Sequence, residues 1–145
     1  MIVNIKYQNK DKLIGMYDSG VKKIQDGNDN FIQYENETLF MDINLLDSTV
    51  KVNKKQSGIF NSEAEIKIKA TNGEKESTYE VSNIPKSIVA HDSLIAINLG
   101  TEVHFINTSG WLIKKYSGKQ EVKDIVLGKS VAGIVYKNRI ELVNL

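Results

Sequence analysis

The chain has 145 residues, a formal net charge of +1 and no cysteine. This length suits one domain, and the near-zero charge gives no overall field that would attract nucleic acid or an anionic membrane. Without cysteine, a disulfide framework, a thiolate zinc site and cysteine catalysis are all excluded. No apolar run approaches the roughly 20 residues of a membrane-spanning helix, and no signal peptide is recognised. We therefore expect no nucleic-acid partner and no membrane contact by this chain itself.

The first unit of the chain, residues 1–27, alternates apolar and polar side chains in the manner of strands. We expect strands at residues 2–7, 13–18 and 21–25, separated by turn residues. They resemble the later strands of a sheet, so we expect the innermost strand of this unit to be missing.

The second unit, residues 31–81, is longer than the others. It contains an alternating strand at residues 64–70 and a turn signal at Asn72-Gly73. The polar stretch at residues 53–62 is an insertion, which we expect to form a loop.

The most informative feature is an internal repeat with a spacing of 37 residues. Residues 86–107 align without a gap with residues 123–144. The identical pairs are Lys86/Lys123, Ile88/Ile125, Val89/Val126, Ser93/Ser130, Ile97/Ile134 and Asn107/Asn144. Apolar positions coincide as well, for example Phe105 with Leu142. A fixed period of this length is typical of stacked repeats.

The third unit, residues 86–118, shows the pattern most clearly. Its expected strands are residues 87–90, 93–98, 102–107 and 111–115. The fourth unit, residues 123–145, supplies three strands and lacks the last one. Within these two units, fully apolar runs at residues 88–90, 94–97 and 125–127 indicate strands that are covered on both faces.

Four short antiparallel strands repeated in this way describe one blade of a β-propeller. The sequence therefore predicts an all-β fold of about four propeller blades in a single domain, with no convincing amphipathic helix. A tight four-bladed ring is one arrangement, and a partial propeller with exposed sheet edges is the arrangement that we favour. A freestanding β-sandwich or small barrel with a similar number of strands is the structural alternative.

The segment at residues 103–116, followed by residues 121–125, resembles the C-terminal blades of uncharacterised clostridial β-propeller proteins of the WD-repeat-like and quinoprotein-like kind. The resemblance implies a longer propeller and an N-terminal membrane anchor outside this chain, and hence an extracytoplasmic location. The Trp-Asp dipeptide of true WD repeats and the tryptophan-docking pattern of quinoproteins are both absent. No binding residue is therefore transferred from those families.

The interaction candidates are few: Trp111, His91, Asp92 and His104. The two histidines lack a spacing that would place both on one metal ion. His104 aligns with the charged Lys67 and Glu141, which predicts a solvated strand face. An Asx-type turn accounts for Asp92, and we expect the single tryptophan to pack in a core or between units.

No arrangement of residues indicates catalysis. Gly128-Lys129-Ser130 imitates the end of a phosphate-binding loop, but Lys123 occupies the position of the first glycine and no helix follows, so we expect a hairpin turn. No paired carboxylates, serine–histidine–acid set or glycine-rich nucleotide turn is found. We therefore expect no enzyme activity, no cofactor and no metal.

The expected function is a non-catalytic scaffold for interaction or ligand sensing, because propellers expose loops and a channel on a rigid frame. The partner would be another protein or a second copy of this chain, bound through exposed blade edges. Two such chains could close an eight-bladed ring by two-fold symmetry. The alternative is an enzyme or polysaccharide-binding module whose site lies in missing N-terminal blades.

Overall fold

The structure, a computed structural model, describes residues 2–9, 12–17, 19–23, 31–35, 37–42, 45–55 and 63–145. This part of the chain contains fifteen strands, which pair antiparallel within their sheets, and it contains no helix. It therefore also contains no helix with the length and apolar character needed to cross a membrane. The prediction of an all-β chain is confirmed for these residues.

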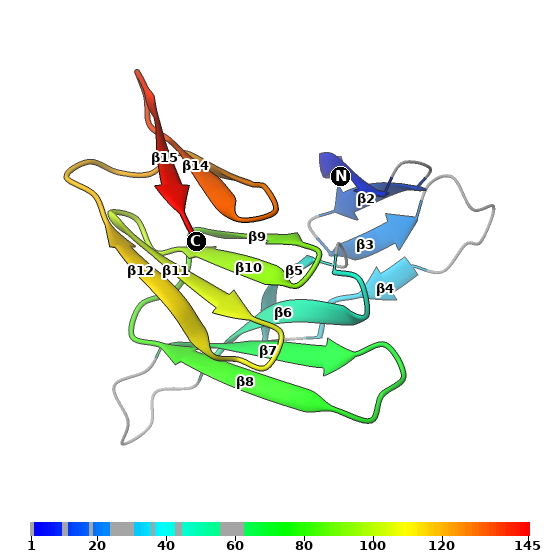
Figure 1. Cartoon of the computed structure of the whole chain (residues 1–145). Helices are drawn as coiled ribbons and strands as arrows, with labels where there is room; N and C mark the ends of the chain where they lie inside the picture. The colour runs from blue at the N-terminus through cyan, green and yellow to red at the C-terminus, as the bar shows by residue number, and fades with distance from the viewer. Residues whose placement is uncertain are drawn as a thin grey trace.

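The strands form four sheets that follow one another along the chain (Figure 1). The first sheet consists of β1 (Ile2–Asn9), β2 (Lys12–Tyr17), β3 (Gly20–Lys23) and β4 (Phe31–Gln33). The second consists of β5 (Thr38–Asp42), β6 (Ser48–Lys54), β7 (Ala64–Ala70) and β8 (Glu76–Val81). The third consists of β9 (Ser87–His91), β10 (Leu94–Asn98), β11 (Glu102–Asn107) and β12 (Leu112–Ser117). The fourth consists of β13 (Asp124–Leu127), β14 (Val131–Val135) and β15 (Ile140–Asn144).

The third sheet packs between the second and the fourth. Because side chains alternate along a strand, each of its faces supplies one core. One face carries Ile95, Ile97 and Ile106, which pack in a cluster with the second sheet. The other carries Val103 and Phe105, which pack in a cluster with the fourth. Full burial of each such side chain stabilises the fold by about 1.5–3 kcal/mol, so both faces of the third sheet anchor its neighbours.

Residues 37 positions apart occupy corresponding strands of the third and fourth sheets, and the same offset relates β7 to β11 and β8 to β12. Phe105 lies on β11 and Leu142 on β15, each the third strand of its sheet. The turns after β7 and β11 correspond as well, because Gly73 and Gly110 have φ angles of +77° and +79°. Glycine adopts this left-handed conformation without the steric penalty of a Cβ atom.

We call the face of a sheet that looks toward the previous sheet along the chain its preceding face, and the opposite face its following face.

The first sheet differs from the expectation for the first unit. We expected three strands with one missing, and the structure shows four. The additional strand, β4, pairs with β3 and places Ile32 opposite Val21, although the sequence pattern assigns residues 31–33 to the second unit. A strand of three residues is too short to show an alternation of its own. The fourth sheet has three strands, as expected.

The polar insertion expected at residues 53–62 begins at the end of β6. Asn53 and Lys54 are the last residues of this strand and pair with Glu65 and Ala64 of β7. Residues 56–62 lie outside the described part of the chain, so the expected loop is not assessed.

Candidate functional site

The following face of the fourth sheet is apolar and uncovered in the described part of the chain. Its residues Val126, Ile140 and Leu142 are 60%, 64% and 78% exposed. They form one surface around Gly133, because a Cβ atom at this glycine would lie 3.5 Å from Ile140 Cγ2 and 3.7 Å from Val126 Cβ. Leu142 pairs directly with Gly133 across the strands. We call these four residues the open face, and the expectation that residues 125–127 are covered on both sides is wrong for Val126.

The same positions are covered one sheet earlier. The residues 37 positions before Ile140 and Leu142 are Val103 and Phe105, which are fully buried. They are buried because the fourth sheet packs over them through Ile134 and other residues of the same cluster. Contiguous exposed apolar surface marks sites of interaction. The following face of the fourth sheet has the apolar composition of a face that is covered in the third sheet.

The outer edge of the fourth sheet is also unpaired among the described residues. The strand order ends at β15, whereas the corresponding β11 of the third sheet has β12 beside it. An unpaired edge strand offers a row of backbone N–H and C=O groups to another strand. The open face and this edge therefore lie side by side on the same strand, β15.

His104 is buried in the junction between the second and third sheets, with only 8% of the residue exposed. Its Nδ1 lies 2.7 Å from the Tyr79 hydroxyl of β8, and its Nε2 is hydrogen-bonded to the Glu102 carboxylate. Because a carboxylate only accepts, Nε2 donates to Glu102, and in the neutral ring Nδ1 accepts the Tyr79 proton. The prediction of a solvated position for His104 is wrong. The position that is charged in the other units, as Lys67 and Glu141, faces the neighbouring sheet here.

The ionisation of this group follows from its contacts. Burial, and then the negative charge of Glu102, raise the pKa of Tyr79, so its hydroxyl stays a donor. The hydrogen bond from His104 is the main cause that lowers the pKa of Glu102, with Lys115, 3.3 Å away, as a further cause. Both ring nitrogens of His104 are occupied by protein partners. The arrangement therefore works as a clasp between two sheets and leaves the imidazole no free nitrogen for a substrate.

The clasp recurs one junction later with a different acceptor. Tyr116 of β12, 37 residues after Tyr79, donates its hydroxyl to Glu141, 37 residues after His104. Its hydroxyl also contacts that of Tyr136. Burial, followed by the hydrogen bond to Glu141, raises the pKa of Tyr116. A tyrosine on the last strand of one sheet thus reaches the third strand of the next at both junctions.

His91 and Asp92 lie at the turn between β9 and β10. The His91 side chain is partly exposed, and its Nε2 is 3.6 Å from an Asp92 carboxylate oxygen. Asp92 has a positive φ of 54°, and its carbonyl accepts a hydrogen bond from the Leu46 N–H at 2.9 Å. The Asp92 carbonyl therefore ties the third sheet to the segment before β6, and the expected Asx-type turn stays a prediction.

Trp111 lies in the turn before β12 and is 74% exposed. The prediction that it packs in a core is wrong. The turn fixes the backbone of Trp111 by hydrogen bonds, and the indole ring is left exposed. The Asn107 side-chain oxygen accepts hydrogen bonds from the N–H groups of Ser109 and Trp111, both at 3.0 Å. His91 and Trp111 belong to the first and last strands of the third sheet, about 14 Å apart at a strand spacing of 4.8 Å. They are not brought together.

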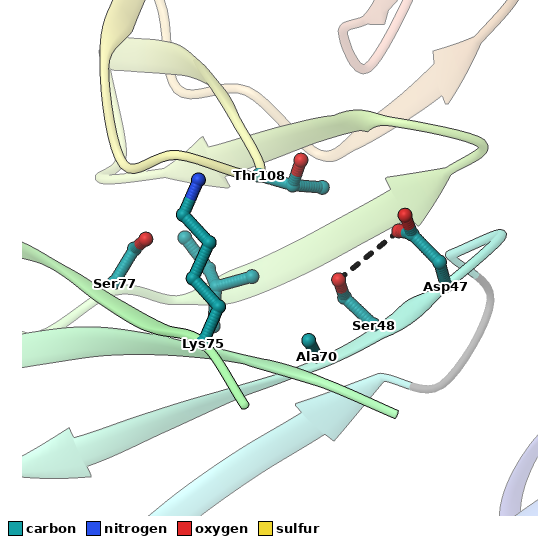
Figure 2. Close-up of a pocket in the computed structure, with 7 residues that line it drawn as sticks. Asp47, Ser48, Ala70, Lys75, Ser77 and Thr108 are labelled. Atoms are coloured by element: carbon teal, nitrogen blue, oxygen red, sulfur yellow. Dashed lines mark hydrogen bonds between the residues drawn. The ribbon is translucent and has the colours of Figure 1, made fainter. Parts of the chain in front are cut away.

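The described part of the chain has cavities between its sheets. A small one, of about 120 Å³, lies near the turn ends of the second sheet and is lined by Ser48, Lys75 and Thr108 among others (Figure 2). There the Ser48 hydroxyl donates to Asp47 at 3.1 Å. This volume is below the 300–1,000 Å³ of ordinary ligand pockets. A larger cavity, of about 420 Å³, lies between β4 and the second sheet. Among the described residues, no group of three or more histidine, aspartate or glutamate side chains could hold a metal ion.

The hairpin expected at Gly128-Lys129-Ser130 is present. The Gly128 N–H donates to the carbonyl of Val131 at 2.8 Å, which closes the turn between β13 and β14.

Sequence reasoning did not identify Tyr79, Tyr116 or Glu141 as contact residues. The available signal is that the two tyrosines are 37 residues apart and that their two acceptors, His104 and Glu141, are 37 residues apart as well.

The comparisons with known proteins support the fold. No protein-family model matches the sequence, and no curated protein matches it. The structure is similar to the crystal structure of Kluyvelomyces marxianus Hsv2, a β-propeller, with a TM-score of 0.61 and 14% sequence identity. The match covers 99% of this chain and 46% of Hsv2, so the chain spans about half the length of that protein. At this identity the likeness shows a propeller-like fold and nothing about activity.

The AfRom2 CNH domain is matched as well. The match covers 99% of this chain and 67% of that domain, with 12% sequence identity and a TM-score of 0.41. This overlap is too loose to support an argument about the fold or the function.

Proposed function

We propose that the chain is a non-catalytic interaction scaffold and that its open face docks on a second copy of the chain. The observation that carries the proposal is the exposure of Ile140 and Leu142 at positions that are fully buried in the preceding sheet, and of Val126 at a position that is partly buried there. A surface built like a covered face is stabilised when another sheet covers it.

The partner that fits this surface is the preceding face of a further sheet. Within the chain, every following face that is covered meets aliphatic side chains such as Ile97 and Ile134. The chain spans about half of Hsv2, so two copies would supply as much chain as one such propeller. Two-fold symmetry would place the fourth sheet of each copy against the first sheet of the other and close a ring.

The energetics of the two open faces are close to the cost of association. A two-fold dimer buries the three aliphatic side chains of both copies, and these six side chains contribute about 9–18 kcal/mol at about 1.5–3 kcal/mol each. Association costs about 4–15 kcal/mol in lost translational and rotational freedom. The proposal therefore includes strand pairing at the free edge of β15, and it implies a dimer of modest affinity.

The test compares two leucines of equal exposure. Leu142 on the open face and Leu46 before β6 are both 78% exposed. Sedimentation equilibrium of the wild type, Leu142→Lys and Leu46→Lys gives the dimer dissociation constant of each. We expect Leu142→Lys to weaken the dimer by about 100-fold or more, because the two leucines buried in a two-fold dimer together contribute about 3–6 kcal/mol. Leu46→Lys should leave the constant unchanged.

A wild-type protein that stays monomeric at high concentration would overturn the docking on a second copy. Equal weakening by both substitutions would show that the association is not directed by the open face. Retained folding of the variants is checked by circular dichroism.

The cellular setting is part of the same proposal. The resemblance to clostridial propellers suggests that the chain belongs to a larger, extracytoplasmic protein with a membrane anchor. Sequencing of the complete open reading frame tests this. A transmembrane helix upstream would support it, and a reading frame without one would contradict it.

A further inference from the structure

The larger cavity separates β4 from the preceding face of the second sheet. It has a volume of about 420 Å³ and is lined by Ile32 and Gln33 of β4 and by Thr49, Lys51, Lys67 and Lys69 of the second sheet, among others. We call this cavity the inter-sheet slot. It lies on a different sheet from the open face and is independent of the proposed function.

The slot borders the preceding face of the second sheet. The corresponding face of the third sheet is packed in a dry core. In the third sheet, Ile95 pairs with Ile106 on the preceding face, and both are fully buried. The corresponding pair of the second sheet is Thr49 with Lys69, since Lys69 precedes Ile106 by 37 residues. In the same way, Ile97 of the third sheet corresponds to Lys51.

Such a face is unsuited to dry packing. Burying an ammonium group without a partner carries a large desolvation penalty. The preceding face of the second sheet is therefore adapted to contact water or a polar ligand, and the cavity between it and β4 gives such a ligand room. Its volume lies within the range of ordinary ligand pockets.

Of the three lysines that line the slot, two form ion pairs within the described part of the chain. Lys51 is paired with Glu35 at 2.9 Å. Lys67 lies 3.6 Å from Glu65 and 3.8 Å from Glu76.

Lys69 lines the same slot, is exposed and lies opposite Glu76 across β7 and β8, but it has no ion-pair partner among the described residues. The hydroxyl group of Thr49 and the amide of Gln33 add hydrogen-bonding groups to this lining, whereas the Thr38 hydroxyl donates to the Asn53 side chain at 3.0 Å. The lining therefore favours a small ligand that is negatively charged and rich in acceptors.

We propose that the inter-sheet slot binds a small oxyanion ligand, one that carries a carboxylate or phosphate group, and that Lys69 provides the charge that recognises it. The paired Lys51 and Lys67 shape the slot. Glu76 opposes the ligand, because it is a carboxylate on the same lining.

The experiment is an NMR titration of the full chain with two probes, inorganic phosphate and succinate, at constant ionic strength maintained with chloride. We expect saturable shifts of slot residues with at least one probe. Saturation by phosphate alone indicates a phosphate ligand, and saturation by succinate alone indicates a carboxylate ligand. Lys69→Met should weaken binding of the active probe by about 10-fold or more, because a charge-assisted hydrogen bond is lost.

Two further variants make the result specific. Lys129→Met removes an exposed lysine from the turn after β13 and should leave binding unchanged. Glu76→Gln removes the opposing carboxylate and should tighten binding. Failure of both probes to give saturable shifts, or equal weakening by Lys69→Met and Lys129→Met, would overturn the proposal.

Discussion

The hydrogen bond between Tyr79 and His104 gives a sharp test of how the sheets are held together. Tyr79→Phe removes only the hydroxyl and keeps the ring that contacts His104 edge-on, with centroids 5.8 Å apart. The variant leaves Nδ1 of His104 without its donor at 2.7 Å, in a side chain that is only 10% exposed. The change therefore isolates one polar contact between the second and third sheets.

The expected loss follows from that burial. A hydrogen bond contributes about 0.5–1.5 kcal/mol net, and a buried group that loses its partner costs about 1–3 kcal/mol. We expect Tyr79→Phe to lower the free energy of unfolding by about 1–2 kcal/mol. For a chain of this size, the melting temperature should fall by about 2–4 °C per kcal/mol.

The assay is urea denaturation followed by far-ultraviolet circular dichroism, because the exposed Trp111 is a poor probe of packing. A double-mutant cycle with His104→Phe separates the contact from other effects of each substitution. We expect a coupling energy of at least about 0.5 kcal/mol for groups in contact. Additive losses in the cycle would refute the view that this hydrogen bond joins the sheets.

Two further predictions concern Tyr116 and the glycine turns. The raised pKa of Tyr116 lies above that of an unfolded tyrosine, near 10. The contribution of Tyr116 to the free energy of unfolding is thus complete below about pH 10 and is lost as the pH rises further. Tyr116→Phe should therefore reduce the decline of the unfolding free energy above about pH 10, measured by denaturation at several pH values. An unchanged decline would contradict the assignment. Gly73→Ala should cost about 1–2 kcal/mol for its left-handed backbone alone. Gly110→Ala should cost more in the same assay, because the new methyl group would lie 3.1 Å from the Thr78 carbonyl oxygen, and equal losses would show that this approach is harmless.

The sequence was most informative where local chemistry decides the structure. Gly73 and Gly110 mark turns that need a positive φ, and this requirement is visible in one residue and its neighbours. The apolar pattern of residues 94–97 likewise identified a strand that is buried in the third sheet. Turns and strand periodicity are short-range properties, so a single sequence carries them.

The contacts between sheets were the part that the sequence could not give. His104 was placed in solvent because its counterparts Lys67 and Glu141 are charged, yet all three positions face a neighbouring sheet. Whether such a position is wet depends on the residue that reaches it from the preceding sheet, as Tyr79 does for His104. Trp111 was misplaced for a related reason, because nothing near it in sequence shows that its ring extends away from both cores.

The alternation of residue types at the junctions limits how the units could be exchanged. The position that faces the preceding sheet is Lys67 in the second unit, His104 in the third and Glu141 in the fourth. Tyrosine can donate to the imidazole or to the carboxylate, but an ammonium group offers no acceptor. A duplicated second unit inserted after the third would thus confront Tyr116 with a lysine, which can only donate to the tyrosine oxygen, and the hydroxyl would lose its acceptor. Although the units share one period, their order is encoded in their junctions, and shuffling them would produce chains that assemble poorly.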